Sequence, residues 1–229
     1  HLETYDVKET SSGTTISFSV SNIPAIAREA RSPEIEVFTP TVKFALNEFS
    51  LVDVDGTAND WKTFGKWQYD NLVAGLDQLP PETITAVNSY VKDAETTEEK
   101  IKRIYQFMQD RTRYISVQLG IGGWKPYPAE EVDRLGYGDC KGLTNYTKAL
   151  LKTQGIESYY TVVHAGEEKR DIDSEFASMQ GNHVILNVPL EDKDIWLECT
   201  SQEMPFNYLG DFTDDRNVLV EPVLSEDPR

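Results

Sequence analysis

A cysteine in a glycine-rich loop, ahead of a predicted helix, is the residue of this sequence best placed for nucleophilic chemistry. Cys140 follows Gly136-Tyr137-Gly138-Asp139 and precedes residues 143–153, where apolar residues at helical spacing predict a helix. Asp139 is a residue type that caps helices at this position. A helix N-terminus presents unpaired N–H groups and a partial positive charge, which favour a thiolate over a thiol. Cys140 is therefore a candidate nucleophile for acyl transfer.

A histidine that could act as a base for this cysteine begins one of two predicted strands. Residues 182–188 and 194–200 are apolar runs typical of strands. Because only residues 189–193 separate them, they predict an antiparallel hairpin. His183 lies at the start of the first strand, and we expect it to lie near the end of the second.

The register of this hairpin decides which residue supports the histidine. A register centred on the linker puts His183 opposite either Glu198 or Cys199, whose side chains point to opposite faces. In one register Glu198 lies directly across from His183, at a Cβ separation of roughly 5 Å. A carboxylate there would fix the imidazole tautomer and stabilise the imidazolium. Cys140, His183 and Glu198 are thus candidates for one acyl-transfer site.

Each of these residues also has a purely structural interpretation. His183 alone could be a satisfied histidine at a strand edge, and Glu198 a solvated carboxylate at a strand end. Apolar residues 195–197 precede Glu198, however, and a carboxylate among them is expected to have a partner. Cys199, inside the apolar run, suits inert packing better than Cys140, which lies in a loop. A disulfide between the two cysteines would require closely facing Cβ atoms.

The balance of charge argues against several kinds of partner. The 229 residues include 39 Asp and Glu against 22 Lys and Arg, a formal charge of −17. Such a surface repels phosphate backbones and anionic membranes, so we expect no nucleic-acid partner. No apolar run approaches the roughly 20 residues that cross a bilayer, so we expect no membrane-spanning segment.

Motifs for a metal or a cofactor are incomplete. Asp53-Val54-Asp55-Gly56 is similar to the start of a calcium loop, but Phe64 stands where such a loop has its twelfth-position glutamate. The glycines at 120–123 are not followed by a predicted helix, as a phosphate cradle would be. The two cysteines and three histidines lack zinc spacing. We therefore expect neither a metal nor a cofactor.

The N-terminal third of the chain has a β pattern. Residues 14–20 and 42–46 alternate at period two and predict strands. The polar and aromatic stretch 61–69 predicts packing against the following domain. We assign residues 1–75 to the C-terminal part of a β-rich, β-sandwich-like domain.

The rest of the chain, residues 76–229, predicts helices followed by strands. Residues 82–92 have helical apolar spacing, and Thr96 with Glu99 forms a capping box for a second helix. Residues 128–132 suit a short helix, and a further strand is predicted over 158–164. Helices followed by strands indicate the α+β class.

The motifs around the three candidate residues resemble those of the transglutaminase-like superfamily. Tyr-Gly-Asp-Cys-Lys-Gly at 137–142 heads a helix, Asn-His-Val at 182–184 begins a strand, and Trp-Leu-Glu-Cys-Thr at 196–200 ends the next. The resemblance covers roughly residues 80–215 and implies a papain-like core of helices packed on an antiparallel sheet, with a Cys-His-Asp triad.

Other segments resemble a bacterial branch in which an all-β domain of unknown function precedes this core. Arg113-Tyr114 and Gly120-Ile-Gly-Gly are similar to that branch, and residues 22–26 and 56–57 resemble the last strands of its β domain. This resemblance implies an exported bacterial protein, at the cell surface or in the periplasm. It also implies further domains beyond both ends of this sequence.

Carried over by position, the resemblance assigns a role to each candidate. Cys140 would be the nucleophile and His183 the general base, while Glu198 stands where the family usually has aspartate. The Cys140 N–H would donate to the oxyanion, together with one upstream side chain. The candidates for that side chain are Gln118, Trp124 and Tyr127.

These roles predict thiol-dependent acyl transfer on amide bonds of a protein or peptide. We expect hydrolysis of a peptide or isopeptide bond, as in a cysteine protease. One alternative is a protein-glutamine transglutaminase, which cross-links proteins with the same triad. The other is a non-catalytic scaffold or binding module that retains a relic of the site.

Overall fold

The structure is a computed structural model that describes residues 8–27, 29, 32, 35–167 and 169–221. The chain divides into two compact units, residues 1–45 and 46–229. The division lies well before residue 75, so the segment 46–75 packs with the second unit. The assignment of residues 1–75 to the end of a β-rich domain stays a prediction.

The first unit contains one hairpin and one short helix. Strand β1 (Lys8–Ser12) pairs antiparallel with β2 (Thr15–Ser19), which confirms the predicted strand over 14–20, and η1 (Ile35–Val37) is a 3-10 helix. The predicted strand at 42–46 is wrong, because these residues are irregular and Phe44 is 82% exposed. Alternation produces a strand only where a second strand supplies hydrogen bonds, and none of the described residues pairs with this segment.

The second unit contains the remaining helices and strands. It begins with β3 (Glu48–Leu51), β4 (Val54–Thr57), α1 (Trp61–Gln68), the π-helix η2 (Tyr69–Val73), α2 (Pro81–Val91) and α3 (Thr97–Arg111). There follow β5 (Arg113–Tyr114), the 3-10 helix η3 (Gly120–Gly123), α4 (Ala129–Leu135), β6 (Tyr137–Gly138) and α5 (Cys140–Lys152). The last strands are β7 (Tyr159–Val163), β8 (His183–Pro189), β9 (Asp194–Leu197) and β10 (Leu219–Glu221).

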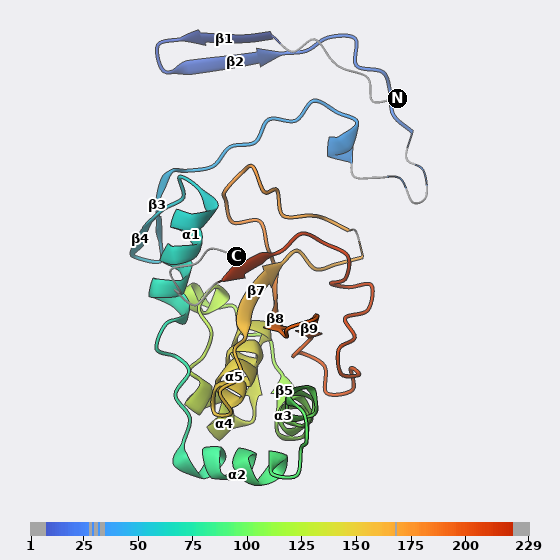
Figure 1. Cartoon of the computed structure of the whole chain (residues 1–229). Helices are drawn as coiled ribbons and strands as arrows, with labels where there is room; N and C mark the ends of the chain where they lie inside the picture. Colours follow the sequence, from blue (N-terminus) through green and yellow to red (C-terminus); the bar gives the residue numbers. More distant parts are fainter. Residues whose placement is uncertain (1–7, 28, 30–31, 33–34, 168, 222–229) are drawn as a thin grey trace. The chain divides into compact units, whose positions relative to one another are not determined.

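Helices packed on an antiparallel sheet form the core of this unit, which is the predicted α+β class. The sheet has the order β10-β7-β8-β9 with every neighbouring pair antiparallel. Helix α5 lies against β8 and β7, and α3 and α4 pack on α5 (Figure 1). The apolar face predicted for α5 is fully buried at Leu143, Tyr146 and Leu150, where it meets Leu186 of β8.

The predicted start of α3 is confirmed, with one difference in its cap. Thr96 is the N-cap, and its side chain accepts a hydrogen bond from the Glu99 N–H at 3.1 Å. The Glu99 carboxylate accepts from the N–H of Glu95 rather than from that of Thr96. The cap therefore satisfies two backbone donors, but the second lies one residue earlier than in a capping box.

Helix α1 and the hairpin β3–β4 form a second apolar cluster, although the sequence predicts no helix there. Asp60 caps α1 by accepting a hydrogen bond from the Thr63 N–H at 2.6 Å. The Phe49 ring of β3 packs edge-on against Trp67 of α1, with ring centroids 4.7 Å apart. Gly56 of β4 lies so close to this pair that a Cβ would approach atoms of both rings to 2.6 Å.

We predict that Gly56→Ala destabilises the protein by about 1–3 kcal/mol, because the added methyl group overpacks the contact between Phe49 and Trp67. The midpoint of urea unfolding measures this change. Gly65→Ala in α1 is the matched control, since a Cβ there meets no atom within 4 Å. It should leave stability unchanged or raise it by up to about 1 kcal/mol. Equal effects of the two substitutions would contradict the prediction.

Candidate active site

The loop ahead of α5 places Cys140 at the first residue of the helix. Asp139 is the N-cap, and its Oδ1 accepts a hydrogen bond from the Gly142 N–H at 2.9 Å. Strand β6 pairs in parallel with β5, which fixes the two residues before Asp139. Gly136 ends α4 with φ +67°, a left-handed conformation that favours glycine. The sequence feature Gly-x-Gly-Asp-Cys therefore specifies one backbone path into α5.

His183 comes to the same end of the helix because α5 packs along β8. It is the first residue of β8, and the next residue, Val184, offers its carbonyl to Thr144 of α5. The Thr144 hydroxyl donates to this carbonyl at 3.3 Å. Since Thr144 lies about one helical turn after Cys140, this bond brings the beginnings of the two elements together.

Glu198 reaches His183 through a different register from the one predicted. Leu186 pairs with Leu197, so the residue opposite His183 would be two positions beyond Glu198. A shift of two residues keeps both side chains on the same face of the sheet. Glu198 approaches diagonally, and its Oε2 lies 2.8 Å from His183 Nε2. The predicted opposite pairing is wrong, although the two side chains do meet.

The Glu198 carboxylate is buried and fully engaged. Its Oε1 accepts hydrogen bonds from the Thr200 N–H at 3.0 Å and from the Thr200 hydroxyl at 2.6 Å. The Tyr105 hydroxyl donates to the Glu198 backbone carbonyl at 2.7 Å. Burial alone would raise the pKa of Glu198, but the hydrogen bonds from His183 and Thr200 and the charge of His183 hold it below its usual value. The carboxylate is therefore ionised at neutral pH.

His183 is held in its protonated form. Burial by itself disfavours the charged ring, but hydrogen bonding to the side chains of Cys140 and Glu198 and the charge of Glu198 raise the pKa of His183 to about 9. Because Nε2 bonds to Glu198, Nδ1 is the nitrogen left for Cys140. The arrangement is a carboxylate, an imidazolium and a cysteine sulfur in sequence, which suits proton transfer by the ring during acyl transfer.

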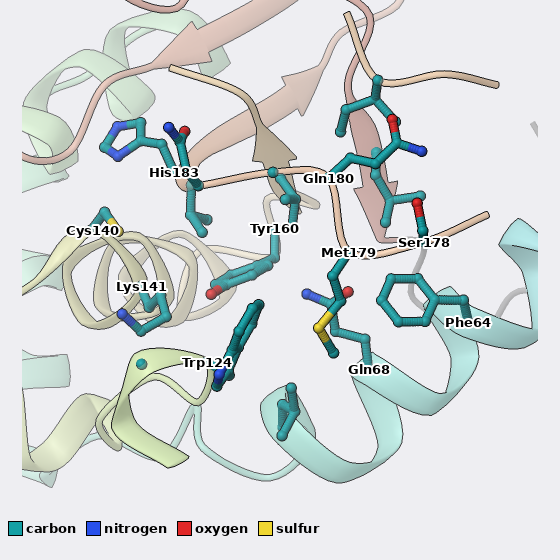
Figure 2. A pocket seen from close by; sticks show the side chains of 18 of the residues that line it. Phe64, Gln68, Trp124, Cys140, Lys141, Tyr160, Ser178, Met179, Gln180 and His183 are labelled. Carbon is teal, nitrogen blue, oxygen red and sulfur yellow. The ribbon is translucent and has the colours of Figure 1, made fainter. Parts of the chain in front are cut away.

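Cys140 and His183 line a cavity of about 410 Å³. Figure 2 shows them at one end of this cavity, while Phe64 and Gln68 of α1 lie at the other. Cys140 is 9% exposed, so its side chain is reached through the cavity rather than from an open surface. A volume of this size is typical of sites that hold a small ligand or part of a chain.

The three oxyanion candidates occupy two different environments. Gln118 and Trp124 line the same cavity as Cys140, and Trp124 lies between its two ends in Figure 2. Tyr127 packs instead against the hydrophobic core and is not among the residues that line the cavity. The geometry thus places two of the candidates within the cavity and leaves the third outside it.

The second cysteine is separate from this site. Cys140 and Cys199 are both free thiols, so no disulfide joins them. Cys199 is fully buried, and burial raises the pKa of its thiol to about 12. Its thiol is therefore neutral, in agreement with the inert packing expected from its apolar neighbours.

Two lining residues are not identified by the sequence patterns. Lys141 is buried and forms an ion pair with Asp139, and both residues flank Cys140 in the sequence. Tyr160 of β7 is also buried, which raises the pKa of its hydroxyl far above the usual value, and Figure 2 shows this hydroxyl directed toward Lys141. A positive charge in the first turn of a helix is unfavourable next to the helix dipole, so Lys141 in the sequence could have indicated a nearby carboxylate such as Asp139. Tyr160 looks like any core residue of an apolar strand.

Two kinds of feature are absent from the part of the chain that the structure describes. None of its helices is long and apolar enough to span a bilayer. No group of three or more His, Cys, Asp or Glu side chains there is arranged to hold a metal ion.

Comparison with known proteins identifies one family. The family model of the transglutaminase-like superfamily matches residues 84–201. Comparison with curated proteins finds no match. The solved structures that are similar include a candidate protease from Parabacteroides distasonis, with 18% identity and a TM-score of 0.49 over 85% of this chain. Another is a candidate cysteine protease from Cytophaga hutchinsonii, with 13% identity and a TM-score of 0.41 over 56% of this chain. The chain covers only 36% and 42% of those two proteins.

We predict that His183 titrates with a pKa of about 9 and that Glu198→Gln lowers this pKa toward 6.5. The substitution keeps the shape of the side chain but removes the charge that favours the imidazolium, so that Cys140 alone remains to oppose the effect of burial. NMR titration of the ring protons measures both values. Since the folded pKa is raised, the stabilising effect of the proton is full below pH 6.5 and is lost as pH rises through 9.

Thr200→Val is the matched control for this titration. It removes a hydroxyl that donates to Glu198 but leaves the carboxylate and its bond to His183 in place. The pKa of His183 should therefore fall less than in Glu198→Gln. An unchanged His183 pKa in Glu198→Gln would show that the carboxylate does not control the ring.

Proposed function

Because the chain belongs to the transglutaminase-like superfamily, we propose that it hydrolyses a peptide or isopeptide bond through a thioester on Cys140. The observation that carries the proposal is the 2.8 Å bond between His183 Nε2 and Glu198 Oε2, with the Cys140 side chain contributing to the raised pKa of His183. Cys140 and His183 line one cavity together, and Glu198 supports His183 from behind it.

In the first half of the reaction, the Cys140 sulfur attacks the carbonyl carbon of the amide. Because His183 already carries its proton, the sulfur attacks as a thiolate that faces an imidazolium. As the carbon–nitrogen bond breaks, His183 gives this proton to the leaving amine and becomes neutral. The product is a thioester on Cys140, and Glu198 holds the ring in place throughout.

In the second half, water attacks the thioester carbonyl while His183 accepts a proton from it. The carbon–sulfur bond then breaks, the carboxylic acid leaves, and the proton taken from water stays on His183, which restores the thiolate and the imidazolium. Each tetrahedral intermediate carries an oxyanion, which needs hydrogen-bond donors. The Cys140 N–H at the start of α5 is one donor, and the side chains of Gln118 or Trp124 are suited to supply the second.

Water, rather than an amine, is the proposed acceptor of the acyl group. Among the described residues that line the cavity there is no carboxylate to hold an incoming ammonium group, whereas water needs no such site. Cross-linking remains the alternative outcome of the test below. A non-catalytic scaffold is disfavoured by the intact set of Cys140, His183 and an ionised Glu198.

We further propose that the substrate lies outside the cytoplasm, on the basis of the resemblance to exported bacterial proteins. Antibody detection in fractionated cells of the source organism tests this location. We expect the protein in the periplasmic or cell-surface fraction. Recovery with cytoplasmic markers alone would contradict the proposal.

The reaction itself is tested with a mixture of peptides in ¹⁸O-labelled water that also contains dansylcadaverine. Hydrolysis should introduce ¹⁸O at new carboxyl termini, whereas cross-linking would attach the dansyl amine to glutamine side chains. Cys140→Ala should abolish the label, and Glu198→Gln should lower the rate by about 10²–10⁴-fold. Cys199→Ala, which removes the buried second thiol, should retain activity.

Alkylation by iodoacetamide at pH 6 tests the nucleophile without a substrate. An imidazolium beside the sulfur favours the thiolate, so Cys140 should react faster than free cysteine. A rate no faster than that of free cysteine, together with no ¹⁸O label, would leave the scaffold as the remaining interpretation.

A further inference from the structure

The cavity beside Cys140 has one wall built from helix α1, a segment that the proposed chemistry does not use. Trp61, Phe64, Trp67 and Gln68 of α1 all line the cavity. We propose that this wall selects a bulky, uncharged apolar side chain of the polypeptide, next to the bond that Cys140 attacks. The inference rests on the proposed function, since it names the substrate class of the same site.

The two tryptophans present only apolar surface to the cavity. The Trp61 Nε1–H donates to the Asp173 carbonyl at 3.0 Å, and the Trp67 Nε1–H donates to the Asp55 carbonyl at 2.8 Å. With both indole donors satisfied, the rings offer no free hydrogen bond to a ligand. They can therefore favour a ligand only through apolar contact.

This wall is held rigidly before any ligand binds. Phe64 stacks against Trp67 with ring centroids 5.9 Å apart and meets Trp61 edge-on at 6.0 Å. Phe64 and Trp67 are 4% and 8% exposed, so the cluster is packed rather than open. A preformed apolar surface binds an apolar side chain without an ordering cost in the protein.

The lining holds no unpaired charge although the protein is strongly acidic. Of the 229 residues 39 are Asp or Glu, yet none of the described lining residues is acidic. Lys141 and the protonated His183 line the cavity, but Asp139 and Glu198 already neutralise them. A charged substrate side chain would therefore lose its hydration without gaining a partner, which is costly.

Two glutamines are available for the backbone of the substrate. The side chains of Gln68 and Gln118 line the cavity and make no hydrogen bond within the described part of the chain. Gln180 and Asn182, in contrast, are engaged by the Asp173 N–H and the Ala165 backbone. An apolar side chain flanked by peptide amides satisfies both features of the cavity.

The test compares four reagents that alkylate Cys140 but differ in one substituent. They are N-benzyl, N-methyl, N-(2-aminoethyl) and N-(carboxymethyl) iodoacetamide, each rate being divided by its rate with glutathione. Mass spectrometry follows the modification of Cys140. The benzyl reagent should saturate and react about tenfold or more faster than the methyl reagent, and both charged reagents should be slower than the methyl one.

Two substitutions, one in the wall and one at another lining residue, link this preference to the cavity. Gln68→Glu keeps the side-chain shape but introduces a carboxylate. The ratio of the benzyl rate to the methyl rate should therefore fall severalfold, and the ratio of the aminoethyl rate to the methyl rate should rise. Met179→Ala removes a lining side chain that is 38% exposed, so the fold should persist while the ratio of benzyl to methyl falls. Lys62→Gln, at an exposed position of α1, is the control and should change neither ratio.

A ratio of benzyl to methyl near one in the folded protein would overturn the inference. So would a ratio that Gln68→Glu and Met179→Ala leave unchanged, with thermal unfolding showing that both variants fold. The proposed function fails in a different way, namely if Cys140 reacts with every reagent no faster than glutathione does. The substituent ratios remain measurable in that case, so the two failures are distinguishable.

Discussion

The packing of α5 along β8 is the constraint on which the site depends. Cys140 begins the helix and His183 begins the strand, so their separation is set by how these two elements lie against each other. The hydroxyl of Thr144 bonds to the carbonyl of Val184, close to both residues. A fully buried apolar face behind this bond prevents α5 from sliding. The geometry of the thiol and the imidazole is thus a consequence of core packing.

Buried charge defines the chemistry that this packing allows. Glu198 could not remain ionised at 3% exposure without the donors of His183 and Thr200, and His183 could not remain protonated without Glu198. Each group is therefore stabilised by the other in the low-dielectric interior. Asp139 and Lys141 follow the same rule, since the buried lysine next to Cys140 is paired with the N-cap carboxylate. These paired charges leave a cavity without net anionic character.

The sequence predicts the elements of the site better than their mutual placement. Helix α5 and the hairpin of residues 182–200 follow from apolar spacing and an Asp cap, which are local properties. The hairpin register does not, because the loop geometry decides it, and the Glu198 contact is consequently diagonal. Helix α1 is stabilised by packing in an apolar cluster with residues of β3 and β4. The segment 42–46 is irregular because no described strand pairs with it. Local patterns do not contain that information.

The segment 46–75 is part of the site in an energetic as well as a geometric sense. Phe64 and Trp67 bury their rings in one hydrophobic cluster with Cys140 and Tyr160. The wall that we propose as a ligand contact therefore belongs to the same cluster that covers Cys140. A substitution that loosens this wall would admit water and weaken every electrostatic interaction near the sulfur. Selectivity and reactivity are consequently coupled through shared packing, although the residues that carry them lie far apart in the sequence.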